Sequence, residues 1–494
     1  MIVRRFLAVN ALLLAATTGM AAGAADRAAV QPQPAAPGTP ARDDSQPSTP
    51  LTLEEVLRSS ARSAPDIIAA LARVQQAEGR ALSAEGAFDT VFSVDARSRL
   101  AGYYDGSEVI GKAERPFAGN GGYLYGQYRN SRGDFPTYED NAYTDQLGEV
   151  KVGALYTLLR DRMIDARRST VSLAGSDIDI ARFERRATAI GVQARTVEAY
   201  QKWVESGLKL KAYQELYDIA VERGKGIRRQ VQLGAKPEIL LTENEANMVK
   251  REALVVQARQ EFRAAANKLS LYYRDAAGLP ILVESDRLPP SAAAFDGMNI
   301  DPFVRIEERP DFGILLAEIE QASVKLALAE NDLRPRLDLR GEVAKDIGPE
   351  GLGGSSRSPL EIIFGVSLKV PLQNRKAQGK LAESRAKLDE LSVKQRYLAE
   401  KIRAEVAGIG IELDTASDLA EAVHRQFTLA DRLAEAERRR FALGSSDFFL
   451  VNSREEAATD ATVKLIEARA RIAAARAQLA AATADESALK LDTL

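Results

Sequence analysis

Long stretches of the chain carry apolar residues at alternating spacings of three and four, the pattern of an α-helix that packs along one side. One such seam lies in the segment 376–442 and consists of Val406, Ile409, Leu413, Ala416, Ala420, Val423, Phe427, Ala430 and Ala434. A second lies in the segment 160–231 and consists of Ala187, Ile190, Ala194, Val197, Gln201, Val204 and Leu208. The pattern predicts two very long helices, each packed against a neighbour.

Four shorter segments alternate apolar and polar residues with a period of two, which is typical of β-strands with one apolar face. The four segments cover about residues 89–104, 145–158, 335–346 and 360–372. Between the first two, residues of roughly 102–146 are expected to form a long external loop. The charged residues of these strands are expected on the face opposite the apolar one. They are Asp95, Arg97, Arg99, Lys151, Arg336, Asp338, Arg340 and Lys369.

This alternation fits two kinds of sheet. One is a half-exposed sheet in a soluble protein. The other is a transmembrane barrel, in which apolar side chains face lipid and polar ones face a wet lumen. Four strands cannot close a wet pore alone, so the second interpretation requires a barrel shared by several copies of the chain.

The chain after residue 50 contains two related halves. Pro65 aligns with Pro310, and Leu233-Gly234 aligns with Leu443-Gly444. Each half has the same expected order of a helix, two strands, a long helix, a sharp turn and a return helix. We therefore expect repeats over 51–290 and 291–494. Their long helices are expected at about 160–231 and 376–442, and their return helices at about 237–273 and 446–484.

The N-terminal residues have the three regions of an export signal. Arg4 and Arg5 precede a short apolar core, and small residues follow through Ala25. This order predicts a cleaved signal peptide over 1–25, because the apolar run is too short for a membrane anchor. Residues 26–50 are rich in proline and alanine and are expected to form an extended tether.

Composition argues against most enzymes and metal proteins. Among 494 residues there is no cysteine and only one histidine, His424, which excludes thiolate zinc sites, iron–sulfur clusters and histidine-pair metal sites. The net charge of −3 gives no strong attraction to nucleic acid. We therefore expect no catalytic site, no cofactor and no bound metal.

Several short strings, repeated in order along the chain, resemble the TolC-like outer-membrane efflux protein family. These strings are Leu51-Thr-Leu-Glu-Glu, Ala64-Pro-Asp, Leu333-Arg-Pro-Arg-Leu, Gly365-Val-Ser-Leu-Lys-Val-Pro-Leu-Gln-Asn, and the paired turns Gln232-Leu-Gly-Ala and Ala442-Leu-Gly-Ser. The resemblance implies an α+β membrane protein that forms a homotrimer. In that fold, two strands from each repeat build a shared twelve-stranded barrel in the outer membrane of a Gram-negative bacterium. The long helices form an α-helical barrel across the periplasm.

The family resemblance also implies a function and partners. Members act as passive ducts for drugs, ions or proteins, together with a periplasmic adaptor protein and an inner-membrane pump of the RND or ABC type. Two alternatives stay open at this point, a periplasmic adaptor and a structural coiled-coil protein of the cell envelope. Neither the cargo nor the pump follows from the sequence.

By the same resemblance, the two helix turns form the periplasmic mouth where the adaptor docks. The turn residues are Leu233, Gly234, Ala235, Leu443, Gly444 and Ser445. Family members often narrow the mouth with aspartates six and nine residues after the second turn glycine, but Leu450 and Ser453 occupy those places here. A different constriction could use the charged neighbours Asp447, Arg454 and Glu455, or Leu450 as an apolar gate.

Overall fold

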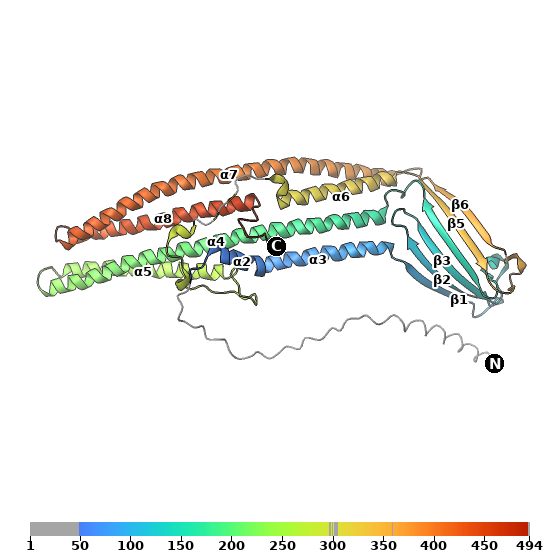
Figure 1. The fold of residues 1–494 in the computed structure, drawn as a ribbon, viewed down its shortest axis with the longest axis horizontal. Helices are drawn as coiled ribbons and strands as arrows, with labels where there is room; N and C mark the ends of the chain where they lie inside the picture. The colour runs from blue at the N-terminus through green and yellow to red at the C-terminus, as the bar shows by residue number, and fades with distance from the viewer. Residues whose placement is uncertain (1–48, 296–297, 299, 301–304, 358, 493–494) are drawn as a thin grey trace, which may run out of the picture. The chain divides into compact units, whose positions relative to one another are not determined.

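Long helices and one antiparallel sheet make up the part of the chain that the computed structural model describes (Figure 1). That part covers residues 49–295, 298, 300, 305–357 and 359–492. The expected signal peptide 1–25 lies outside the described residues, as does the tether except for its last two residues. No helix among the described residues is long and apolar enough to cross a membrane.

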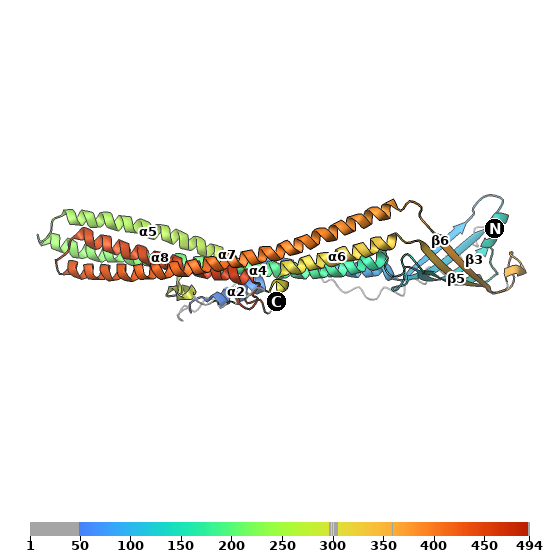
Figure 2. The ribbon, with the colours of Figure 1, turned by 90° about the horizontal axis from the view of Figure 1, so that it is seen from above.

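Two helices dominate the described chain. α4 (Ala166–Gln232) has 67 residues and α7 (Arg375–Ala442) has 68, so each is about 100 Å long at 1.5 Å per residue. α3 (Pro65–Glu85) and α5 (Ile239–Leu269) pack along α4, and α6 (Pro310–Asp332) and α8 (Phe448–Ala482) pack along α7. α4 also packs against α6 and α8, so the two sets of helices lie side by side (Figures 1 and 2).

The seam predicted on α7 is confirmed residue by residue. Ala416, Ala420 and Ala434 are buried, and the six other seam positions are half-buried. Most positions between them are exposed. A spacing of three and four therefore identified the side of α7 that packs.

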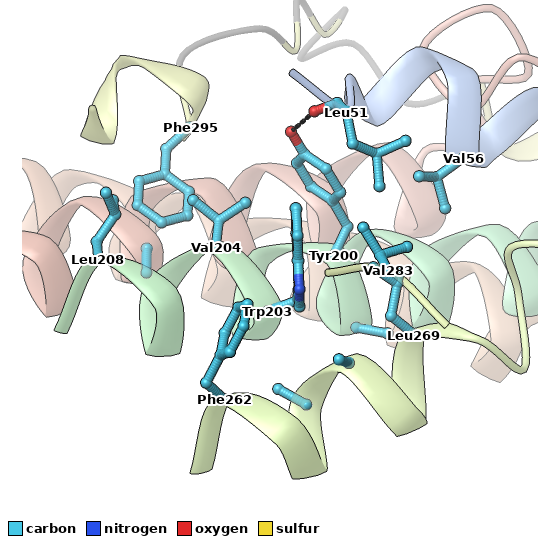
Figure 3. Close-up of a cluster of buried hydrophobic side chains, with 14 of the residues drawn as sticks. Leu51, Val56, Tyr200, Trp203, Val204, Leu208, Phe262, Leu269, Val283 and Phe295 are labelled. Atoms are coloured by element: carbon cyan, nitrogen blue, oxygen red, sulfur yellow. Dashed lines mark hydrogen bonds between the residues drawn. The ribbon is translucent and has the colours of Figure 1, made fainter. Parts of the chain in front are cut away.

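The core at the middle of α4 joins several helices (Figure 3). Trp203 is fully buried and stacks on Phe262 of α5, with 6.1 Å between the ring centroids. Tyr200 donates a hydrogen bond of 2.9 Å to the Leu51 carbonyl, next to the short helix α2 (Leu53–Ser63). Ile466 of α8 belongs to the same cluster. The N-terminal segment of the described chain is thus fixed to α4, α5 and α8.

The sheet has six strands rather than the four predicted. β1 (Val91–Ser98), β2 (Ser107–Pro116), β3 (Tyr123–Arg132), β4 (Glu149–Thr157), β5 (Arg336–Asp346) and β6 (Glu361–Lys369) pair in chain order, each antiparallel to the next. The first half of the chain supplies four of them and the second half two. The prediction of two strands in each half is therefore wrong for the first half.

The expected external loop 102–146 is also wrong, since it contains β2 and β3. Their alternation was hard to detect because Gly111 and Gly126 stand at apolar positions. Tyr123 and Tyr125, which look apolar in sequence, alternate on the opposite, polar side of β3. A strand is recognised in sequence by alternating apolar and polar residues. Here glycine stands on the apolar face and tyrosine on the polar face, so this alternation is weak.

Candidate functional site

The register of the sheet gathers most of the predicted charged residues on one face. Residues directly opposite each other in paired strands share a face, and alternate residues of one strand point the same way. On these grounds seven of the eight predicted residues share a polar face. They are Asp95, Arg97, Lys151, Arg336, Asp338, Arg340 and Lys369.

Arg99 is the exception. It lies beyond the end of β1, and its guanidinium is 2.6 Å from the Glu139 carboxylate in the segment between β3 and β4. The prediction that Arg99 belongs to the strand is therefore wrong, because β1 ends at Ser98 rather than at about residue 104.

Ion pairs cross the polar face between neighbouring strands. Arg97 of β1 is 2.5 Å from Glu108 of β2, and Arg129 of β3 is 2.5 Å from Glu149 of β4. Tyr125 of β3 donates a hydrogen bond to Glu342 of β5. Glu108 and Arg129 were missed in the sequence because they lie in the segment that was expected to be a loop.

The opposite face of the sheet is apolar and exposed. Its large side chains are between 41% and 76% exposed, and no helix of the described chain covers them (Figure 1). These exposed side chains are Phe92, Val94, Val109, Leu124, Tyr128, Val150, Val152, Tyr156, Val343, Ile362, Phe364, Val366 and Leu368. A continuous apolar surface of this extent marks contact with a membrane or with another protein.

The two turns that end α4 and α7 have the same geometry. Gly234 has a φ of +73° and Gly444 a φ of +76°, values that favour glycine. The N–H groups of Ala235 and Ser445 each donate a 2.9 Å hydrogen bond to the carbonyl five residues earlier. The leucines before the two glycines, Leu233 and Leu443, are 77% and 83% exposed. Each turn thus presents one apolar side chain to its surroundings.

The residues after the second turn separate into different environments. Asp447 caps α8 and accepts a 2.7 Å hydrogen bond from the Leu450 N–H. Ser453 is exposed, and Leu450 and Arg454 are half-buried. Glu455 is only 1% exposed, so in this structure it does not line an aqueous opening as the sequence had suggested.

Glu455 instead connects four helices. From α8 it pairs with Arg223 of α4, with Arg251 of α5 at 3.3 Å and with Arg438 of α7 at 3.5 Å. Asn452, one turn earlier on α8, accepts hydrogen bonds from Arg223 at 2.7 Å and from Arg251 at 3.1 Å. We call these five residues the Glu455 cluster. No local pattern in the sequence indicates this cluster, because its members are brought together only by packing.

The charged groups of the Glu455 cluster affect one another strongly because they are buried. Arg251 is 1% exposed. This burial, together with the nearby Arg223, lowers the pKa of Arg251 below its ordinary value, although Glu455 opposes the shift. Within the described chain, Glu455 is the carboxylate that pairs with all three guanidinium groups.

Comparison with known proteins agrees with this geometry. Residues 305–485, less than half of the chain, match the family described as outer membrane efflux protein. No curated protein matches the sequence of the chain.

The described fold is similar to solved outer-membrane channels. The Campylobacter jejuni channel CmeC is 15% identical with a TM-score of 0.58, over 87% of this chain and 85% of CmeC. The open state of Neisseria gonorrhoeae MtrE is 15% identical with a TM-score of 0.60, over 90% of each chain. Vibrio cholerae VceC is 14% identical with a TM-score of 0.58, over 87% of this chain and 96% of VceC. The predicted resemblance to the efflux family is confirmed, and the match agrees with the prediction that the chain is not an enzyme.

Proposed function

We propose that this chain, whose second half contains an outer membrane efflux protein domain, is one subunit of a passive export channel. The observation that carries the proposal is the sheet, which has an exposed apolar face and a charged opposite face. Strands of this kind suit a membrane barrel, with apolar side chains toward lipid and polar ones toward a water-filled lumen. The expected signal peptide supports export to the outer membrane of a Gram-negative bacterium.

A single copy would leave the two edges of the sheet unpaired. Within the described chain, β1 pairs only with β2 and β6 pairs only with β5. Unpaired backbone groups are costly in hydrocarbon, so a sheet in a membrane must close on itself or on other copies. We propose that β1 of one copy pairs with β6 of the next and that three copies close the barrel.

The helices support a conduit through the periplasm. α7 buries only six of its 68 residues within the chain, namely Leu391, Ile402, Ala416, Ala420, Ala434 and Glu437. In a trimer, the remaining surface of α7 would face the neighbouring copy on one side and the water-filled conduit on the other. This arrangement would continue the lumen of the barrel as a tube of helices.

The two turns would form the periplasmic mouth of that tube. The exposed side chains of Leu233 and Leu443 suit docking of a periplasmic adaptor, which would link the channel to an inner-membrane pump of the RND or ABC type. Asp447, Leu450, Ser453 and Arg454 follow the second turn and are the candidates to narrow the mouth. The Glu455 cluster would hold the two hairpins, α4–α5 and α7–α8, in a fixed relation, so opening would require this cluster to rearrange.

The two alternatives from the sequence are less favoured. A periplasmic adaptor would carry one helical hairpin within compact β-domains, whereas this chain has two hairpins joined by a single sheet. A structural coiled-coil protein has no need for a sheet with an exposed apolar face.

Fractionation followed by native mass measurement tests the proposal. The mature protein should fractionate with the outer membrane, require detergent for extraction and have three times the mass of the mature chain. A water-soluble monomer that needs no detergent would contradict both the membrane location and the shared barrel.

A further inference from the structure

The hairpin β2–β3 lies at the same height in the sheet as the other four strands. One row of directly opposed residues crosses the whole sheet and consists of Phe92, Ala113, Gly126, Val152, Val343 and Ile362. A hairpin that projected beyond the sheet would be displaced along the strands and would not share this row. β2 and β3 have ten residues each, which is the length of a strand that crosses a bilayer at a tilt.

The hairpin also continues the apolar face of its neighbours without a break. The row of opposed residues that runs from Phe92 to Ile362 contains only apolar residues and glycine. On the same face β2 adds Val109, which is 45% exposed, and β3 adds Leu124, which is 47% exposed. The polar residues of the hairpin on this face stand near the strand ends, where a membrane strand meets water: Ser107, Arg115, Asn130 and Arg132.

The other face of the hairpin is polar, like that of the neighbouring strands. The next row along the strands runs through Ser93, Lys112, Gln127, Lys151, Ala344 and Glu361. The pairs Arg97–Glu108 and Arg129–Glu149 join the hairpin to β1 on one side and to β4 on the other. A hairpin serving as an external cap would have no reason to keep one apolar and one charged face in phase with four other strands.

We infer that β2 and β3 span the membrane beside the other strands, so that three copies of six strands form an eighteen-stranded barrel rather than the twelve-stranded one implied by the family resemblance. The inference rests on the proposed function, because it needs the sheet to lie in a membrane and three copies to share it. Barrel diameter grows roughly linearly with strand number, so the barrel would be about one and a half times as wide as with twelve strands, and its lumen wider too. Glu108, Lys112 and Arg129 would join the charges that line it.

Single cysteines can test the orientation of the hairpin, since the chain has no cysteine of its own. Val109→Cys and Leu124→Cys probe its apolar face, and Lys112→Cys and Gln127→Cys probe its polar face. Val152→Cys and Lys151→Cys are matched references on the two faces of β4. Each full-length variant is labelled with an environment-sensitive fluorophore, assembled in vesicles and exposed in turn to brominated lipid and to aqueous iodide.

Brominated lipid should reduce the emission at positions 109 and 124, as it does at 152, and iodide should quench 112 and 127 as it quenches 151. If iodide quenches 109 and 124 while brominated lipid still quenches 152, the hairpin lies outside the membrane and the inference is overturned, although the channel proposal stands. If brominated lipid fails to quench 152 as well, the proposed function itself is wrong. If Val109→Cys or Leu124→Cys does not assemble, it is replaced by Tyr128→Cys, which lies on the same face of β3 as Leu124.

Discussion

Glu455 lies where the two helical hairpins meet, and its burial determines what its removal does. Its carboxylate contacts guanidinium groups from α4, α5 and α7 and is almost fully shielded from water. Removing one partner of a buried ion pair leaves an uncompensated charge, which typically costs about 3–5 kcal/mol. The neighbouring Glu456 offers a contrast, because it pairs at 2.8 Å with a Lys250 side chain that is 61% exposed.

We therefore expect Glu455→Gln to lower the free energy of unfolding by about 3–5 kcal/mol, and Glu456→Gln by less than about 1 kcal/mol. Denaturant titration followed by the fluorescence of Trp203, the single tryptophan, measures both. Equal stability of the two variants would show that the Glu455 cluster does not hold the hairpins together.

Glu205 of α4 makes stability depend on pH. Burial raises the pKa of Glu205, but hydrogen bonds from Lys209 and Lys202 outweigh it, and the pKa lies below the ordinary value of 4.5. Lys209 also reaches Glu467 of α8 at 2.6 Å. Because the folded protein holds the ionised form more strongly than the unfolded chain does, this stabilisation is present above pH 4.5 and is lost as the pH falls through the lowered pKa.

Glu205→Gln should therefore be less stable than the wild type at neutral pH and should lose less stability on acidification below pH 4.5. The exposed Glu215 of the same helix is the control, and Glu215→Gln should keep the wild-type pH profile. Unfolding free energies measured from about pH 3 to 7, a window that includes the ordinary pKa of a glutamate carboxylate, test this. Parallel profiles for all three proteins would contradict the role of Glu205.

At the scale of elements, the turns after α4 and α7 depend on glycine. A Cβ atom added at Gly234 or Gly444 would meet no atom within 4 Å outside the adjacent residues, whereas the positive φ of both glycines strains any other residue. A non-glycine residue at a positive φ strains the backbone by about 1–3 kcal/mol. A turn relieves this strain by changing its conformation.

The double variant Gly234→Val, Gly444→Val should therefore abolish export while the barrel still assembles, because the turns would no longer present Leu233 and Leu443 to the adaptor. Gly226→Val is a control, since Gly226 lies inside α4 at an ordinary helical φ and an added Cβ has room there. Efflux measured in whole cells reports loss of export, and native mass measurement reports whether the trimer still assembles. Normal export by the double variant would refute the docking role of the turns.

The elements also show what a sequence can reveal about this fold. The helices were predictable because each repeats one spacing over many turns, as the seam of α7 does. β2 and β3 were not, because Gly111 and Gly126 contribute no side chain to the apolar face. The burial of Glu455 could not be inferred either, since its partners lie on three other helices and a local pattern in α8 carries no information about them.

At the scale of the whole molecule, a homotrimer repeats every substitution three times. An arginine facing lipid near the middle of a membrane barrel costs about 2–4 kcal/mol, so one in each of three copies would cost about 6–12 kcal/mol in the assembly. Phe364 of β6 is 76% exposed on the apolar face, and Ser367 lies three residues along the same strand on the polar face. The two positions differ in the face they occupy while sharing the same edge strand.

Phe364→Arg should therefore prevent stable insertion into the outer membrane, whereas Ser367→Arg should be tolerated, since its side chain would enter a wet lumen. The yield of detergent-extracted trimer from the outer-membrane fraction measures both outcomes. Because both substitutions place the same charge on the edge strand that would meet the next copy, a defect in subunit pairing alone would affect them alike. Only contact of the apolar face with lipid predicts loss of the trimer for Phe364→Arg and its retention for Ser367→Arg.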